Sequence, residues 1–222
     1  MNSILIKQGE NACISVQIPE CLGGINGEAI YIDTEGSFST ERLILIARYT
    51  ITHCQKISKL MKLSNEELRQ VENLDELKML KSIFYFRCTD QSQLLCLTYR
   101  LHNFCLSHPK VRLIVIDSIA FHFRYDSIDI PQRNRILTVL GQNLSNIANQ
   151  FGISLHDRYL CHPCYIEQDI DIFRRMYGFK NSLCLFSLIV YKDESFQYSH
   201  KKHESFRDRF FGIYITLLKR LM

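Results

Sequence analysis

Carboxylates stand at the ends of two apolar runs in this chain. The run Ala29–Ile32 leads into Asp33 and Glu35, and the run Leu113–Ile116 leads into Asp117. Such apolar runs favour parallel strands that are covered on both faces. Open α/β sheets bind their ligands at the carboxyl ends of these strands, so the acids could belong to one site. A solvated acidic turn after a buried strand explains the first run equally well.

The run that ends in Asp117 has the form of a Walker B strand, whose carboxylate holds the magnesium shell beside the phosphates of a nucleotide. Glu35, at a neighbouring strand end, could then orient or deprotonate the attacking water. Each motif is a weak signal by itself. Two of them in one alternating chain indicate a nucleotide site in which Asp117 binds magnesium through water.

The elements that must position these acids alternate between helices and strands. Apolar residues at helical spacing behind Ser, Thr and Asp caps predict helices, over about 39–61, 64–81, 89–108 and 132–151. Apolar and aromatic runs predict strands over 29–32, 83–86 and 111–117, and one more from Ile153. Residues 1–15 show no clear periodicity. The alternation predicts an α/β fold with a mostly parallel, doubly wound sheet.

Composition indicates a soluble globular protein. Of the 222 residues, 46% are hydrophobic and 23% charged, with a net charge of +4. That mild charge permits contact with nucleic acid without arguing for it. No apolar stretch is long enough for a signal peptide or a membrane span. The nine scattered cysteines therefore predict free thiols in a reducing, intracellular compartment.

The segment Tyr31–Phe38, followed by Glu41-Arg42-Leu43, resembles the part of the RecA-type ATPases of homologous recombination that carries their catalytic glutamate. Within that family, the chain is most similar to the C-type paralogues of the eukaryotic DNA-repair recombinase. Three further stretches carry this likeness: Gln17–Cys21, Tyr85–Cys88 and Val111–Phe121. The resemblance covers about residues 15–155 and implies a partial RecA-like P-loop NTPase core.

The resemblance also implies roles for single residues. Glu35 would be the catalytic, water-activating acid, and Asp117 the Walker B carboxylate that binds Mg²⁺ through water. Asp33 and Ser118, beside them, would contribute to cofactor binding. Arg124 and Arg133 flank a segment that resembles the first DNA-binding loop, although a solvated arginine-bearing loop is the plainer interpretation.

The implied cofactors are ATP and Mg²⁺. The implied partners are sister recombinase paralogues and DNA, single-stranded or branched, with no membrane. The implied location is the nucleus, with the cytoplasm as a second one.

The chain departs from the family at the phosphate loop, G-x-x-x-x-G-K-[ST], which should stand just before Ser15. The chain has Lys7–Ala12 there; Gly9 lacks a partner glycine at the right spacing, and Lys7 precedes it. We therefore expect no backbone cradle, no phosphate-binding lysine and no helix amino terminus for the anion. This predicts a chain that does not hydrolyse ATP alone and leaves ATP binding open.

The family pattern stops again near Leu155. The sequence divides into a leader (1–14), a partial RecA-like core (15–155) and a divergent extension (156–222). The extension holds thirteen of the 25 aromatic residues and no alanine, so translated non-coding or frame-shifted sequence explains it better than a second domain does. Without the family strand after Leu155, Val111–Asp117 would have an unpaired edge. The Cys-His-Pro-Cys run at 161–164 is too tight for a zinc site.

Three functions follow from these patterns. The first is a recombination paralogue that binds DNA with ATP in a paralogue complex and is itself hydrolysis-defective. The second is a non-hydrolysing fragment that keeps a partner surface. The third is a truncated product, from an alternative transcript or a gene model, that has no function.

Overall fold

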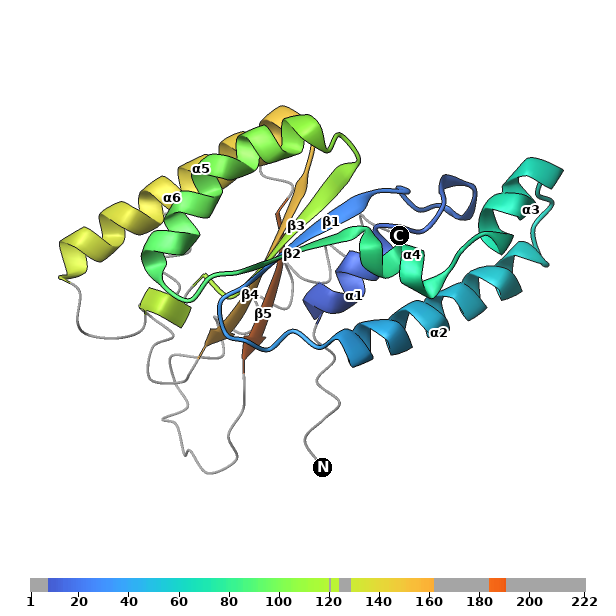
Figure 1. The fold of residues 1–222 in the computed structure, drawn as a ribbon, viewed down its shortest axis with the longest axis horizontal. Coiled ribbons are helices and arrows are strands. Elements are labelled where there is room, and N and C mark those ends of the chain that lie inside the picture. The colour runs from blue at the N-terminus through green and yellow to red at the C-terminus, as the bar shows by residue number, and fades with distance from the viewer. Residues whose placement is uncertain (1–7, 120, 124–128, 162–183, 191–222) are drawn as a thin grey trace, which may run out of the picture. The chain divides into compact units, whose positions relative to one another are not determined.

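The sheet of this protein is parallel throughout its described part. A computed structural model describes residues 8–119, 121–123, 129–161 and 184–190. Five strands pair in the order β2-β1-β3-β4-β5. Their bounds are Glu28–Asp33 for β1, Ile83–Arg87 for β2, Val111–Asp117 for β3, Ser154–Cys161 for β4 and Cys184–Val190 for β5. The predicted α/β fold is confirmed (Figure 1).

Helices cover both faces of this sheet. They are α1 (Gln8–Ser15), α2 (Thr40–Ser58), α3 (Asn65–Glu72), α4 (Glu76–Lys81), α5 (Gln91–Ser107) and α6 (Ile130–Phe151), with 3₁₀ turns η1 (Glu20–Leu22) and η2 (Phe121–Phe123). Helices α5 and α6 lie together on one face, and α1, α2 and α4 lie on the other (Figure 1). Within the described residues, no helix is long and apolar enough to cross a membrane.

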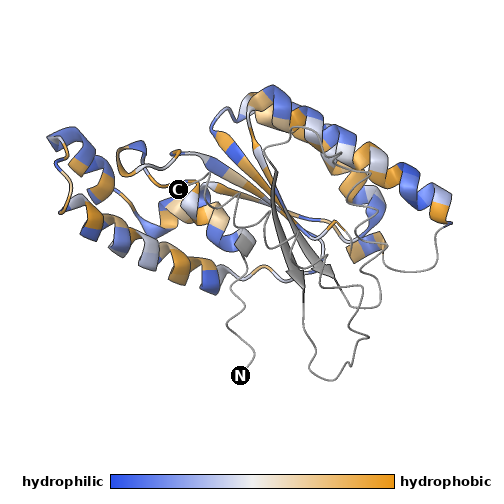
Figure 2. Ribbon diagram, turned by 180° about the vertical axis from the view of Figure 1, so that it is seen from behind, coloured by the Kyte–Doolittle hydropathy of each residue, from blue (hydrophilic) through white to orange (hydrophobic). Residues whose placement is uncertain are grey.

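Alternate residues of β1 enter different cores. Ile30 and Ile32 of β1 pack with α5 and α6, whereas Ala29 and Tyr31 pack with α1. Side chains alternate across a strand, so burial on both faces requires an uninterrupted apolar run. Figure 2 shows these hydrophobic strands between helices that carry both hydrophilic and hydrophobic residues. The continuous runs that lead into the acids are therefore explained by the two helical layers.

The helix predicted over 64–81 is two helices. Ser64 caps α3 in a capping box with Glu67, as its sequence indicates. The helix ends at Glu72, and Asp75 then starts α4 by accepting a 3.1 Å hydrogen bond from the Lys78 N–H. An aspartate that caps a new helix competes with continuation of the previous one. That local competition was not visible in the apolar periodicity.

A helix also occupies part of the segment in which no regular element is expected. Helix α1 lies close to the sheet at Gly9, where an added Cβ would come within 2.7 Å of Val115 Cγ1. Cys13 and Ile14, farther along α1, are fully buried. Glycine allows this close approach because it has no side chain. Residues 8–15 therefore form a helix although their sequence shows no clear periodicity; the residues before Gln8 lie outside the described part.

Strand β3 is paired along both edges. It pairs with β1 on one side and with β4 on the other, where Leu113–Ile116 faces Ser154–Asp157. The expected unpaired edge of β3 is therefore wrong. Unsatisfied buried backbone groups would cost about 1–3 kcal/mol each, so this pairing matters for stability. The first residues of the divergent extension thus form a strand, as do residues 184–190.

Candidate functional site at the carboxyl ends of β1 and β3

The carboxyl ends of β1 and β3 lie side by side. Asp33 and Asp117 are partners in the parallel register, and both are fully buried. The pairing continues beyond the strands, because the Thr34 and Glu35 N–H groups donate to the Asp117 carbonyl at 2.8 and 3.3 Å. The structure therefore brings together all four acid and hydroxyl residues predicted for the site: Asp33, Glu35, Asp117 and Ser118.

The Asp117 carboxylate is held by two hydroxyl groups. Its Oδ2 accepts a 2.7 Å hydrogen bond from the Tyr31 phenol and a 3.0 Å bond from Ser37 Oγ. Burial raises the pKa of Tyr31 above its ordinary value, and the Asp117 charge raises it further. The phenol therefore remains a protonated donor. Tyr31 and Ser37 fix the orientation of Asp117, and sequence reasoning missed both roles.

Glu35 is linked to the same strand end through Ser118. Ser118 Oγ donates a 3.0 Å hydrogen bond to Glu35 Oε1, and Glu35 is partly exposed. Between them lies the buried hydroxyl of Thr34. Its oxygen accepts from the Ser118 N–H at 2.7 Å and lies within 2.9 Å of the Asp117 and Ser118 carbonyls. The hydroxyl between two acids in Asp33-Thr34-Glu35 was the available signal for this role.

Asp33 shapes the turn that carries Glu35. Its Oδ1 accepts from the Gly36 N–H at 2.7 Å and the Ser37 N–H at 3.3 Å, and its Oδ2 accepts from the Phe38 N–H at 3.4 Å. Gly36 has a φ of 75°, which glycine adopts readily. Asp33 thus acts as an acceptor for the backbone of this turn.

Strand β2 contacts Asp33 from the other side. The Tyr85 phenol donates to Asp33 Oδ2 at 3.1 Å. Arg87 Nη1 donates to the Asp33 carbonyl at 2.9 Å and lies 3.5 Å from Oδ1. Burial and the Asp33 charge both raise the pKa of Tyr85, which keeps its proton on the phenol. The charge of the buried Asp33 is therefore partly balanced by a guanidinium.

A further buried acid approaches this edge from α1. Glu10 is fully buried; it accepts from the Ser39 N–H at 3.2 Å and from Arg42 Nη1 at 3.0 Å. It therefore connects α1 to the start of α2, directly after the turn that carries Glu35. Cys13 lies near enough that burial, and then the Glu10 charge, raise its pKa. No motif in the sequence indicated Glu10.

Arg133, one of the two predicted DNA-binding residues, takes part in none of the contacts described above. Arg133 lies on α6, where its Nη1 donates to the Phe123 carbonyl at 3.5 Å. Arg124 lies outside the described residues, as do His162 and Cys164 of the tight Cys/His run. The DNA-binding role of both arginines stays a prediction.

The oxygen atoms at this edge are of the kind that a hydrated magnesium ion prefers. In the described ranges, no group of three or more His, Cys, Asp or Glu residues could hold a metal ion alone. Asp117, Ser37 and Ser118 nevertheless present carboxylate and hydroxyl oxygens, which suit a hard cation that keeps several waters. Magnesium would then need phosphate oxygens as well. Asp117 and Ser118 are both fully buried in this structure, and Mg²⁺ binding through Asp117 stays a prediction.

A parallel sheet covered by helices, with acids at the carboxyl ends of two adjacent strands, defines a RecA-like α/β fragment. Residues 7–65 match the family model described as Rad51. The DNA repair protein RAD51 homolog 3 of Cricetulus griseus is 40% identical over 142 residues, and that of Dictyostelium discoideum 35% over 142. The DNA repair and recombination protein RadA of Aeropyrum pernix is 24% identical over 145 residues.

The chain is similar to the RecA-type recombinases, and its similarity to two proteins named RAD51 homolog 3 confirms the predicted resemblance. Each of the three matches covers 64% of this chain. The chain spans only 36–38% of the length of those curated relatives. The similarity therefore extends over only part of the relatives' length.

Proposed function

We propose that this chain acts in DNA repair by homologous recombination, as a recombinase paralogue that binds sister paralogues in the nucleus and does not hydrolyse ATP alone. The names of its relatives support the repair role. One structural observation carries the partner-binding role: an open groove lies between α5 and the last residues of the edge strand β2.

The groove lies between β2 and α5. In the described part of the chain, β1 is the only strand that pairs with β2. A cavity of about 450 Å³ is lined by Phe86 of β2 and by Leu97, Arg100, Leu101, Asn103, Phe104 and Ser107 of α5. A second cavity of about 260 Å³ shares three of these residues, Phe86, Leu97 and Arg100. Edge strands pair readily with an extended segment of another chain, and apolar pockets beside them give specificity.

The acids at the carboxyl ends of β1 and β3 favour descent from a nucleotide-binding protein. They give no support to ATP hydrolysis by this chain. Asp33 and Asp117 both accept hydrogen bonds from other groups of the protein. A structural role is therefore enough to explain why these two acids are present. A bound ATP–Mg²⁺ complex would supply the phosphates; Asp117 would hold the metal through water, with Asp33 and Ser118 nearby and Glu35 facing the water. The sequence has no Gly-Lys pair from which a phosphate loop could be built. DNA, single-stranded or branched, would contact Arg124 and Arg133.

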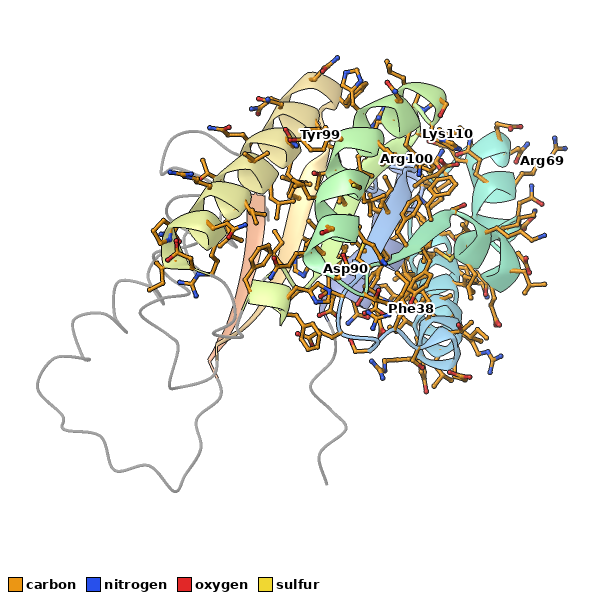
Figure 3. The ribbon with its side chains drawn as sticks, turned by 60° about the vertical axis from the view of Figure 1, so that its left-hand side comes forward. Phe38, Arg69, Asp90, Tyr99, Arg100 and Lys110 are labelled. Carbon is orange, nitrogen blue, oxygen red and sulfur yellow. The ribbon has the colours of Figure 1, made fainter. Side chains whose placement is uncertain are left out.

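Affinity purification from cells, followed by detection of sister paralogues, tests the partner role. Arg100 is exposed and lines both cavities, so Arg100→Glu should reduce recovered paralogue about tenfold or more. Arg69→Glu is the matched control, because Arg69 is 73% exposed on α3. Figure 3 shows both arginines on separate helices. Equal recovery with the two variants would reject this groove as the partner surface.

Two further measurements separate the alternatives. Purified chain should show no ATP turnover above that of Glu35→Gln. Turnover that disappears in Glu35→Gln would overturn the non-hydrolysing role. A cooperative thermal transition is expected of a folded partner-binding protein, whereas its absence would favour a truncated product without function.

A further inference from the structure

We infer that Arg87 couples the groove between β2 and α5 to the turn that carries Glu35. The turn comprises residues 34–38, and the groove is the pair of cavities described above. Arg87 is the last residue of β2 and is 37% exposed at its side chain. Arg87 lines the groove and also contacts the turn, whereas the other residues of the groove and of the turn come from different segments.

On the side of the turn, Arg87 makes three contacts. Its Nη1 donates to the Asp33 carbonyl and faces the Asp33 carboxylate. Its Nη2 would lie 3.1 Å from a Cβ added to Gly36, so the guanidinium packs directly against the turn's backbone. Asp33 in turn accepts the Gly36 N–H. The guanidinium and the carboxylate therefore hold Gly36 from two sides.

On the side of the groove, Arg87 lines the smaller cavity. That cavity also contains Cys96 and Gln93 of α5, and Phe86 and Cys88 beside Arg87. Gln93 is itself held at the start of α5, where its side chain accepts from the Thr89 N–H and hydroxyl. A group that enters this cavity would meet the aliphatic stem and guanidinium of Arg87. Figure 3 shows Asp90, where α5 begins, and Arg100 farther along that helix.

The consequence is a positioning role for Arg87. A displaced guanidinium would loosen the Asp33 carboxylate from β2 and leave the Gly36 contact open. The turn between Asp33 and Phe38 would then lose some of the contacts that order it, and Glu35 would move with the turn. The positioning role of Arg87 is inferred from these contacts alone. Only the identity of the cavity's occupant, a recombinase paralogue, rests on the proposed function. The test below therefore uses no partner.

Amide hydrogen exchange of the full chain, followed by NMR, tests the coupling at Gly36, Ser37 and Phe38. Arg87→Ala should accelerate amide exchange at Gly36 about tenfold, because the charge-assisted contact between the guanidinium and Asp33 is lost. Arg87→Lys should restore part of the protection. Arg48→Ala removes an exposed ion pair with Glu76 and should leave all three amides unchanged. Unchanged exchange in Arg87→Ala would overturn the positioning role.

A second variant fills the cavity from within. Cys96→Trp places an indole beside Arg87, and we expect the exchange rate at Gly36 to change about threefold or more. Leu106→Trp is its control, because Leu106 is 59% exposed on α5 and lines neither cavity. If Arg87→Ala alters the turn while Cys96→Trp does not, the coupling to the groove is wrong. Paralogue recovery is measured separately, so either proposal can fail without the other.

Discussion

Tyr31 and Asp117 lie on neighbouring strands, and the Tyr31 phenol donates a 2.7 Å hydrogen bond to the Asp117 carboxylate. The phenol is 1% exposed and the carboxylate fully buried. A charge-assisted hydrogen bond of this length, out of water, is stronger than a neutral one. It joins the interior of β1 to the terminal residue of β3 and fixes the acid expected to face magnesium.

Replacing Tyr31 by Phe should lower the free energy of unfolding by about 1–3 kcal/mol, because the Asp117 carboxylate loses its closest donor. Denaturation by urea would measure this change. Tyr49→Phe is the control, since Tyr49 is 74% exposed and should shift stability by less than about 0.5 kcal/mol. Equal effects of the two substitutions would mean that the Tyr31 bond contributes little.

The free energy of unfolding should decrease at alkaline pH. Burial raises the pKa of the Cys105 thiol to about 11, from 9.0 for a free thiol. The unfolded chain then releases this proton at lower pH than the folded chain, so the stabilisation is complete below pH 9.0 and is lost as the pH rises towards about 11. Tyr31, whose pKa is also raised, adds to the loss above pH 10.

Urea denaturation between pH 8 and 11 would measure this loss. Cys105→Ala should flatten the decline by about 1–3 kcal/mol across the interval. Cys96→Ala, at an exposed thiol, should leave the slope as it is. A decline of the same size in both variants would assign it to other groups.

Removal of Arg42 should be costlier than removal of Arg48. Arg42 neutralises the fully buried Glu10, whereas Arg48 pairs with Glu76 at the surface. We expect Arg42→Ala to lose about 1–3 kcal/mol, because the buried Glu10 carboxylate loses the guanidinium with which it forms an ion pair. Arg48→Ala should lose at most about 1 kcal/mol. Thermal unfolding of both variants at one pH checks this order, and its reversal would contradict the account of Glu10.

Asp33→Asn should destabilise the turn locally and the protein modestly. The amide keeps one oxygen acceptor but replaces the other by a donor that faces Tyr85 or the backbone N–H groups of the turn. We expect a loss of about 1–3 kcal/mol and faster amide exchange at Gly36. Asp75→Asn, at an exposed helix cap, should cost well under 1 kcal/mol because asparagine caps almost as well. Undiminished protection at Gly36 would contradict the capping role of Asp33.

The sheet and its acids were predictable because their signals are local. The run that ends in Asp117 is apolar at every position except Arg112, and β3 has the predicted bounds, Val111–Asp117. Ser39 and Asp90 cap α2 and α5 through their side chains, as their positions indicate. These features depend on periodicity and caps within a few residues.

The contacts that hold the site could not be predicted in the same way. In the sequence, Tyr31 looks like one more apolar residue of a strand. Its phenol donates a hydrogen bond to Asp117, which is 86 residues farther along the chain. Glu10 and Arg87 reach the site from α1 and β2, which touch it only in the folded protein. Pairing of β4 with β3 depends on neighbours in space, so the sequence of 156–161 did not indicate it. Sequence patterns located the acids, whereas tertiary packing determined what each one contacts.

The double use of Asp33 and Asp117 affects how evolutionary constraint at these two positions should be interpreted. Both carboxylates accept hydrogen bonds that hold a turn and a strand end together. Selection for folding alone would then retain them whether or not the chain turns over nucleotide. Invariance of these two positions among paralogues is therefore weak evidence of catalysis. Glu35, which is partly exposed and bonded through Ser118, is the position at which substitution rates can distinguish an ATPase from a binding subunit.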